Sequence, residues 1–249
     1  MLASRWYFQV KSRCPGRCAV CFRAVLEAVW RTLFPPRCLG CGVHGQAVCG
    51  RCAQNLPYLP PRVCHRCASP GPRRTACRAC ARLSPALARV RAVFAYEGVA
   101  RRAVHAFKFR SGRYLAPLLG TWLRANLEQR PMHADLVVPV PLAPGRLRER
   151  GYNQAALLAE QVVPLVGGPL AAALLERADR PPQQTLTANQ RLANLHGAIR
   201  CRDHDHVRSK TVLVMDDVMT TGATLSACAD ALTEAGARRV IALVFARDL

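Results

Sequence analysis

Long apolar runs, aromatic residues and the usual nucleotide-binding motifs are scarce or missing in this sequence. No stretch approaches the ~18 consecutive apolar residues of a membrane-spanning helix, so an integral membrane protein is not expected. The first residues carry Arg5, Lys11 and Arg13 without the apolar segment of a secretory signal, so we expect a cytoplasmic protein. Aromatic residues make up only 6%, too few for an extensive surface on which bases could stack. The Walker A and G-x-G-x-x-G signatures are absent, which disfavours nucleoside triphosphates and dinucleotides.

Acidic residues are scarce in the first part of the chain. Residues 1–95 contain 16 Lys and Arg against one acid, Glu27, which gives a net charge of +15. Residues 96–249 contain 20 basic and 14 acidic residues, a net charge of only +6. A segment this basic, if it faces water, favours a polyanionic partner such as nucleic acid or an anionic membrane surface.

Cysteine is abundant, and eleven of the thirteen cysteines precede residue 81. Eight of them form four C-x-x-C pairs within 43 residues: Cys38, Cys41, Cys49, Cys52, Cys64, Cys67, Cys77 and Cys80. Without a secretory signal this pattern favours metal over disulfides, and four thiolates suit a closed, structural zinc site. We therefore predict two zinc ions in a double zinc ribbon, with the cysteines paired either in sequence or interleaved. A thiol-redox protein is the alternative.

Residues from about 90 onward alternate between strand and helix patterns. Apolar runs predict strands at the positions listed here: 90–96, 135–141, 211–216 and 239–245. Helical patterns lie between them: 98–108, 114–129, 152–166 and 223–236. This alternation predicts an α/β domain with a parallel sheet covered on both faces, whose ligands bind at the carboxyl ends of the strands. A further short helix is predicted over 24–34, ending at two prolines.

One strand end carries the sharpest motif, Asp216-Asp217-Val218-Met219-Thr220-Thr221-Gly222-Ala223-Thr224. The threonine hydroxyls and the backbone N–H groups that open the following helix suit a phosphate monoester. Gly222 permits a close approach of the backbone. The two acids would repel a phosphate, but they suit the vicinal hydroxyls of a ribose. The motif therefore predicts a ribose 5-phosphate site.

This motif resembles the loop that binds phosphoribosyl pyrophosphate (PRPP) in type I phosphoribosyltransferases, and the whole chain resembles their competence protein F (ComF) branch. Further segments carry the resemblance: 34–38 before the cysteines, 96–98 with 105–109, 138–142 through 148–154, and 184–197. It implies an N-terminal extension (1–33), a double zinc-ribbon module (34–88) and a parallel-sheet type I phosphoribosyltransferase-like domain (89–249).

The resemblance also implies roles for individual residues. Asp216 and Asp217 would bind the ribose of PRPP, and they would act in catalysis together with Arg191 of the mobile loop over 179–191. The other PRPP-binding positions would be Thr220, Thr221, Gly222, Ala223 and Thr224. A pyrophosphate loop over 140–154 would contribute Leu142, Arg146, Arg148 and Arg150, although a solvated basic turn would have the same composition. Lys108 is a candidate ligand contact or a surface lysine, and Mg²⁺ would accompany PRPP.

Two functions remain open at this point. ComF-like proteins are associated with natural transformation, so the resemblance implies a role in DNA uptake, with the zinc module and basic surface binding single-stranded DNA and with DNA-processing or uptake proteins as partners. The alternative is a metabolic, PRPP-dependent transferase with a small-molecule acceptor. Whether phosphoribosyl transfer is catalysed stays open. Purine-salvage relatives carry an acid for proton transfer at the position of Thr220, which cannot serve that role, so purine salvage is not expected.

Overall fold

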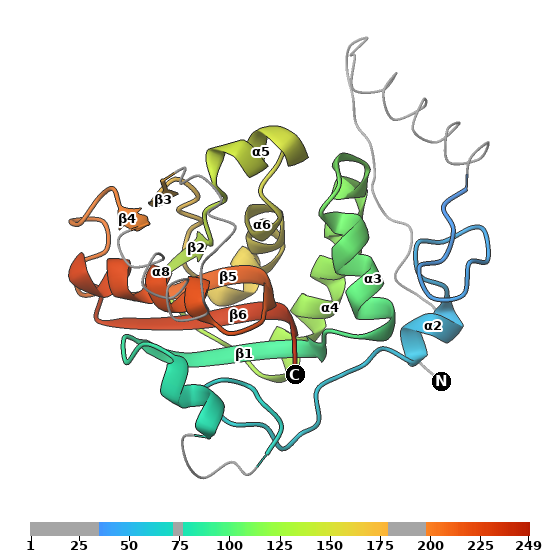
Figure 1. The fold of residues 1–249 in the computed structure, drawn as a ribbon, viewed down its shortest axis with the longest axis horizontal. Coiled ribbons are helices and arrows are strands. Elements are labelled where there is room, and N and C mark those ends of the chain that lie inside the picture. Colours follow the sequence, from blue (N-terminus) through green and yellow to red (C-terminus); the bar gives the residue numbers. More distant parts are fainter. Residues whose placement is uncertain (1–34, 72–76, 179–197) are drawn as a thin grey trace, which may run out of the picture.

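Four strands form one parallel sheet in the computed structural model, which describes residues 35–71, 77–178 and 198–249 (Figure 1). The strand order is β1-β6-β5-β2, and the bounds are β1 Leu87–Ala95, β2 Leu136–Pro139, β5 Thr211–Met219 and β6 Arg239–Arg247. All four predicted strands are confirmed, and β5 and β6 extend beyond their predicted ends. Because the strands are parallel, their carboxyl ends meet at one edge of the sheet.

Helices cover both faces of this sheet, as the sequence predicts. They are α3 Gly98–Phe107, α4 Ala116–Gln129, α6 Gln154–Val166 and α8 Ala223–Glu234. Alternate side chains of a strand point to opposite faces. Leu213 and Met215 therefore join one core with α3, α4 and α6, while Val212 and Val214 join a second core with α8. Among the described helices, none combines the length and the apolarity that crossing a membrane requires.

Two short strands that the sequence analysis did not identify form a separate antiparallel pair beside α8. They are β3 Leu175–Arg177 and β4 Ile199–Cys201. They flank residues 179–197 in the chain. The predicted mobile loop and its Arg191 fall in that segment, outside the described residues. The helix predicted over 24–34 also lies outside them.

The region 140–154 is not a loop throughout, and this part of the prediction is wrong. Residues Pro144–Arg150 form helix α5, followed by the short turn that leads into α6. Proline suits the first turn of a helix because its missing N–H would have no partner there. Gly151 ends the helix in the left-handed conformation, at φ 80°, which glycine adopts without strain. The sequence therefore contained both signals of this helix.

The two cysteine modules lie on either side of edge strand β1. The segment that joins them pairs with this strand, since the backbone N–H of Leu59 donates to Val93 O (3.1 Å) and that of Ala95 to Pro57 O (2.8 Å). The first ribbon (residues 37–54) contains α2 Gly50–Gln54 and packs on the α3 side. The second ribbon (residues 62–71 and 77–84) contains the 3-10 helix η1 Arg78–Arg82 and packs on the α8 side (Figure 1).

Candidate sugar-phosphate site and metal centres

The predicted phosphate loop, residues 220–224 (hereafter the phosphate loop), connects the end of β5 to the start of α8. Thr220 and Thr221 are exposed, and the backbone N–H of Ala223 donates to Thr221 Oγ1 at 3.4 Å. Gly222 caps the helix at φ 82° and is buried. The first N–H groups of α8 have no helical partner and carry the positive end of the helix dipole, so this end of the helix attracts anions. The loop thus lies at the carboxyl-terminal edge of the sheet, where parallel α/β sheets bind their ligands.

Lys108 forms an ion pair with Asp217, which connects α3 to the end of β5. Its Nζ lies 3.5 Å from Asp217 Oδ2, and the carboxylate is almost completely buried. The segment that carries Lys108 is held by Tyr152, whose hydroxyl lies 2.5 Å from the carbonyl oxygens of Phe107 and Phe109. Lys108 is therefore paired with an acid of the candidate site rather than a lysine with its charge in solvent. Its contact with a ligand stays a prediction.

Asp216 lies beside Asp217 and has an unusual protonation equilibrium. Removal from water is the main cause, and the charge of Asp217 adds to it, so that the pKa of Asp216 is raised to about 8. Lys108 and the backbone N–H of Asp217, which donates to Asp216 Oδ1 at 2.8 Å, act in the opposite direction. Near neutral pH the pair therefore carries less than two full negative charges. Hydroxyl groups or a cation in contact with it would favour full ionisation.

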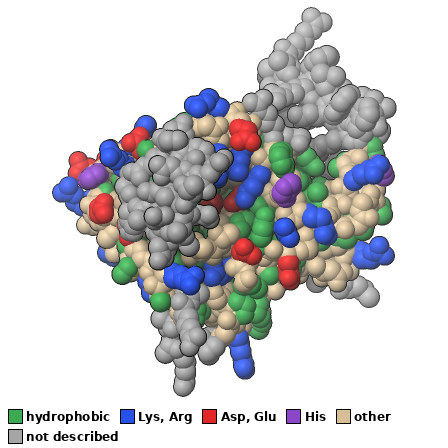
Figure 2. All heavy atoms as spheres, in the orientation of Figure 1, with side chains coloured by type: hydrophobic (Ala, Val, Ile, Leu, Met, Phe, Trp, Pro, Cys, Tyr) green, Lys and Arg blue, Asp and Glu red, His purple; other side chains and the backbone are tan. Residues whose placement is uncertain are grey.

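Arg177 on β3 interacts electrostatically with Asp216 on β5. Burial is the largest cause of a lowered pKa of Arg177, and the nearby charge of Arg146 adds to it, whereas Asp216 raises that pKa. Arg177 is therefore within electrostatic range of both Arg146 on α5 and Asp216. Arg150 instead donates to Gln154 Oε1 at 3.0 Å. On the face of the molecule that Figure 2 shows, Lys and Arg side chains lie around the middle, with Asp and Glu side chains between them.

The remaining predicted positions are less tightly assembled. Arg148 is exposed on α5, and Leu142 is half-buried just before that helix. Val140 joins this segment to the sheet, because its N–H donates to Met215 O and its carbonyl accepts from Asn153 Nδ2, both at 2.9 Å. The segment predicted to bind pyrophosphate, residues 140–154, is thus anchored next to β5, and its three arginines lie on helix α5.

The eight paired cysteines form two groups in sequence order, which decides between the two predicted arrangements. The first cluster is Cys38, Cys41, Cys49 and Cys52, and the second is Cys64, Cys67, Cys77 and Cys80; within each, the ligand atoms lie within 4.8 Å of one another. In the second cluster the Cys64–Cys80 and Cys67–Cys77 sulfurs are 3.3 Å apart. Tetrahedral zinc with bonds of ~2.3 Å would place them about 3.8 Å apart. Among the described residues all cysteines are free thiols.

The chemistry of both clusters suits a cation. Burial raises the pKa of Cys38, but backbone N–H groups outweigh it and lower the pKa to about 6. Two of these N–H groups, those of Gly40 and Cys49, lie 3.3 Å from its sulfur. In contrast, hydrogen bonding to Cys49 and burial raise the pKa of Cys52 to about 12. Some thiols are thus prepared for ionisation, while the full set of four needs a positive ion to become charged. A redox dithiol would not explain two complete groups of four.

Two parts of the chain match known domain families. Residues 29–81 match the double zinc ribbon domain, and residues 150–249 match the phosphoribosyl transferase domain. The competence protein ComFC of Bacillus subtilis is 28% identical over 84% of this chain and 85% of its own length. The chain is thus similar to competence proteins of the ComF type over most of its length. Further relatives are the DNA utilization protein YhgH of Salmonella typhimurium (28% identical; 94% of this chain, 91% of that protein) and competence protein F of Haemophilus influenzae (26%; 82% and 86%).

Two solved structures have a lower similarity to this chain. A hypoxanthine phosphoribosyltransferase of Staphylococcus aureus is 14% identical over 53% of this chain and 62% of that chain, with a TM-score of 0.33. The glutamine PRPP amidotransferase of Bacillus subtilis is 17% identical, with a TM-score of 0.34; the match covers 57% of this chain and only 26% of that longer one.

The sequence analysis missed two arginines next to the site. Arg177 lies near Asp216, as described above. Arg247, the last residue of β6, is buried and hydrogen-bonds to Thr220 O at 3.1 Å. In a chain with 36 basic residues, of which only three are Lys, single arginines carry no local signal. For Arg247 the only indication was its place just after the strand predicted over 239–245, and Arg177 had none.

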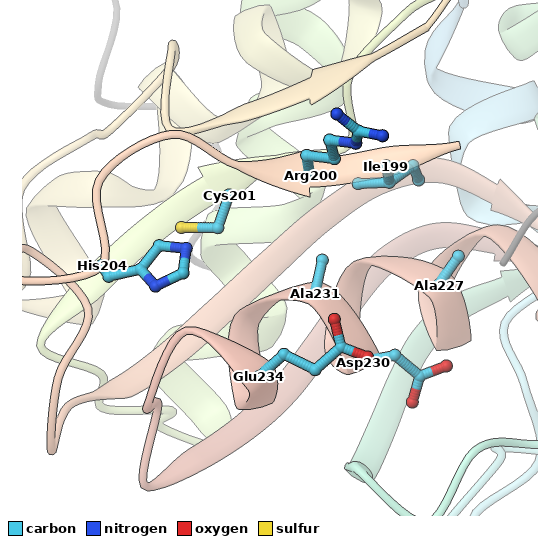
Figure 3. Close-up of a pocket in the computed structure, with 8 residues that line it drawn as sticks. All are labelled: Ile199, Arg200, Cys201, His204, Ala227, Asp230, Ala231 and Glu234. Atoms are coloured by element: carbon cyan, nitrogen blue, oxygen red, sulfur yellow. The ribbon is translucent and has the colours of Figure 1, made fainter. Parts of the chain in front are cut away.

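A pocket of about 310 Å³ lies away from the phosphate loop, between β4 and α8 (Figure 3). Asp230 and Glu234 project from one turn of α8, and Cys201 and His204 lie across from them. Two carboxylates and the guanidinium of Arg200 line this pocket, and no residue of the phosphate loop does. Cys201 and His204 also belong to neither cysteine cluster among the described residues.

Proposed function

We propose that this ComF-like protein binds PRPP with Mg²⁺ and acts in the cytoplasm in DNA uptake or utilisation, with single-stranded DNA as its second ligand. The observation that carries the PRPP site is the pairing of Lys108 with Asp217 beside the phosphate loop. A basic turn or a helix end alone would not need two adjacent acids, of which Asp217 is buried, whereas a ribose phosphate uses both the acids and the anion-binding loop. The names of the relatives, competence and DNA utilization proteins, support the DNA role.

Each part of the site has a separate task in this proposal. The N–H groups and hydroxyls of residues 220–224 would hold the 5-phosphate, and Asp216 and Asp217 would accept hydrogen bonds from the ribose hydroxyls. Arg146 and Arg148 would contact the pyrophosphate, since guanidinium groups pair phosphate oxygens bidentately. Bound Mg²⁺ would neutralise charge on the pyrophosphate. Lys108 would hold Asp217 in place and keep its charge compatible with the neighbouring Asp216.

Calorimetry tests the PRPP site directly. PRPP with Mg²⁺ is titrated into the wild type and into a variant with Asp216→Asn and Asp217→Asn, which keeps the side-chain volumes. We expect binding by the wild type and loss of measurable binding by the variant. Asp203→Asn together with Asp205→Asn, exposed acids in the loop after β4, is the matched control and should leave the affinity unchanged. Equal affinity in all three proteins would contradict the site.

The DNA role depends on exposed arginines of the zinc ribbons. Arg51 and Arg62 are exposed, one in each ribbon. Phosphate contacts of this kind make the affinity for DNA fall steeply with salt. We expect Arg51→Gln with Arg62→Gln to weaken binding of a fluorescent single-stranded oligonucleotide and to flatten its salt dependence by about one unit per lost contact.

A matched control removes the same charge elsewhere. Arg202 and Arg208 are exposed but form ion pairs with Glu176 and Asp205. Their replacement by Gln should leave both the affinity and the salt dependence of DNA binding nearly unchanged. A similar loss in both variants would mean that only net charge matters, and a flat salt response of the wild type would contradict the DNA role.

Whether the protein transfers a phosphoribosyl group is tested with labelled PRPP, Mg²⁺ and candidate acceptors, including nucleic acid. Release of pyrophosphate that depends on nucleic acid would join the two proposed ligands in one reaction. Release that depends on a small acceptor instead would favour the metabolic alternative. Binding without release would assign PRPP a regulatory role.

A further inference from the structure

Arg247 links the second zinc ribbon to the phosphate loop. It is buried, and its guanidinium donates to Ser69 Oγ from Nε (3.2 Å) and Nη2 (2.8 Å). Its Nη1 donates to Thr220 O at 3.1 Å. A buried charge is costly unless its hydrogen-bond donors are satisfied, so the three bonds fix this side chain in one position. The side chain therefore holds two segments of the chain together at a fixed distance.

The hydrogen bond to Thr220 orients the loop. In a trans peptide the C=O and the following N–H point in opposite directions, and cis peptide bonds are absent from the described residues. Because the carbonyl of Thr220 points toward Arg247, the N–H of Thr221 points the other way. Thr220 and Thr221 are both exposed. Arg247 thereby fixes the orientation of this peptide, with the N–H donor of Thr221 directed away from the arginine.

Ser69 connects this arginine to the second cluster. Its hydroxyl lies 3.4 Å from the sulfur of Cys67, and its carbonyl accepts from the N–H of Cys64 at 2.7 Å. A metal-bound thiolate can only accept a hydrogen bond. The single proton of Ser69 would then point to Cys67, and the oxygen lone pairs would remain for Arg247. The bonds from Cys67 to Thr220 are therefore mutually consistent when all four thiols are ionised.

The second ribbon also contacts the other end of the loop. Leu83, three residues after Cys80, is buried so close to Gly222 that a Cβ there would lie 2.4 Å from its Cδ2. The N–H of Ser84 donates to Ser226 Oγ in the first turns of α8 at 3.1 Å. The first ribbon makes its corresponding contact elsewhere, through Arg102 of α3 to the carbonyl of Gly40 at 3.4 Å.

We infer that Arg247 is a positioning residue through which metal at the second cluster and sugar phosphate at residues 220–224 strengthen each other's binding, while the first cluster does not take part. This inference rests on the proposed PRPP site. Coupling between two ligands is reciprocal, so PRPP must raise the zinc affinity of the second cluster by the same factor by which zinc raises the affinity for PRPP.

The test compares Ser69→Ala and Arg247→Met with Arg102→Met, which removes the equivalent link of the first ribbon. Thermal melts and a zinc content of two per chain first establish that each variant is folded. PRPP affinity with Mg²⁺ is then measured by calorimetry. We expect the first two variants to bind PRPP about fivefold or more weakly and Arg102→Met to bind it like the wild type. If Arg247→Met does not fold, Ser69→Ala carries the test alone, because it removes only a hydroxyl.

A second measurement does not depend on PRPP affinity in the variants. Zinc is removed with a zinc-selective chelator in excess Mg²⁺, and the freed thiols are alkylated and assigned to peptides by mass spectrometry. In the wild type, PRPP should protect Cys64, Cys67, Cys77 and Cys80, but not the cysteines of the first cluster. Ser69→Ala should abolish this protection.

The outcomes separate the two ideas. Failure of the wild type to bind PRPP would overturn the proposed function and this inference with it. Binding by the wild type with unchanged affinity in Ser69→Ala, or equal protection of both clusters, would overturn the inference alone.

Discussion

Replacing Gly222 by alanine tests how tightly the phosphate loop is packed against the second ribbon. Gly222 has φ 82°, and a Cβ would lie 2.4 Å from Leu83 Cδ2 and 2.5 Å from Met219 Cε. The left-handed backbone costs alanine about 1–2 kcal/mol. Displacing the ends of two buried side chains adds about 1–2 kcal/mol, the lower part of the range for overpacking. Together these give about 2–4 kcal/mol of lost stability.

Thermal unfolding measures this loss. At ~2–4 °C per kcal/mol for a chain of this size, Gly222→Ala should lower the Tm by roughly 5–15 °C. Gly98→Ala is the matched control: this glycine also has a positive φ, 49°, but no atom lies within 4 Å of the added Cβ. Gly98→Ala should lose only the about 1–2 kcal/mol of stability that the left-handed backbone costs alanine. Equal Tm values for the two variants would refute the packing argument.

A double mutant isolates the contact with the ribbon. Leu83→Ala lowers the stability by itself, but it removes the atom nearest to the new Cβ. In the Leu83→Ala background, Gly222→Ala should therefore lower the Tm less than it does in the wild type. Perfect additivity of the two substitutions would show that Leu83 does not limit the space at Gly222.

Three further predictions concern charge and metal. The native pKa of Asp216, about 8, lies above the unfolded value of ~3.9, so the wild type loses stability as the pH rises between these values. The Tm of Asp216→Asn should therefore exceed that of the wild type by more at pH 8 than at pH 5. A difference in Tm that does not change with pH would contradict the raised pKa. Lys108→Met leaves the buried Asp217 without its partner and should cost about 1–3 kcal/mol in chemical denaturation, the cost of one unsatisfied buried group. Asp217→Asn in the same chain should restore most of this loss, and no restoration would argue against the ion pair. Removal of zinc should lower the Tm and release two ions per chain, since metal binding supplies folding energy to such small modules; a fully folded protein without zinc would contradict both metal centres.

The two zinc ribbons have similar cysteine patterns but pack against different parts of the protein. Both contain two C-x-x-C pairs, with seven residues between the pairs in the first ribbon and nine in the second, and the sequence analysis treated them as one module. In the structure the buried sulfurs of the second cluster join the core under α8, whereas the first ribbon packs beside α3. Residues 57–59, which join the two ribbons, pair with edge strand β1, so the ribbons pack on opposite faces of the sheet. No local sequence pattern predicts this pairing.

The sequence by itself determined the features that depend on near neighbours in the chain. Cysteine spacing predicted two sites of four ligands without deciding which cysteines share a site, apolar runs predicted the strands, and the Asp216–Thr224 motif predicted the loop at a strand end. Only the tertiary structure brought Lys108 to Asp217, Arg177 to Asp216, and Arg247 to both Ser69 and Thr220. Ser69 and Arg247 are 178 residues apart, and such a contact exists only because the parallel sheet gathers its strand ends at one edge, where the second ribbon also packs. Local spacing therefore decided which chemistry the chain can hold, and packing decided which of its many arginines take part.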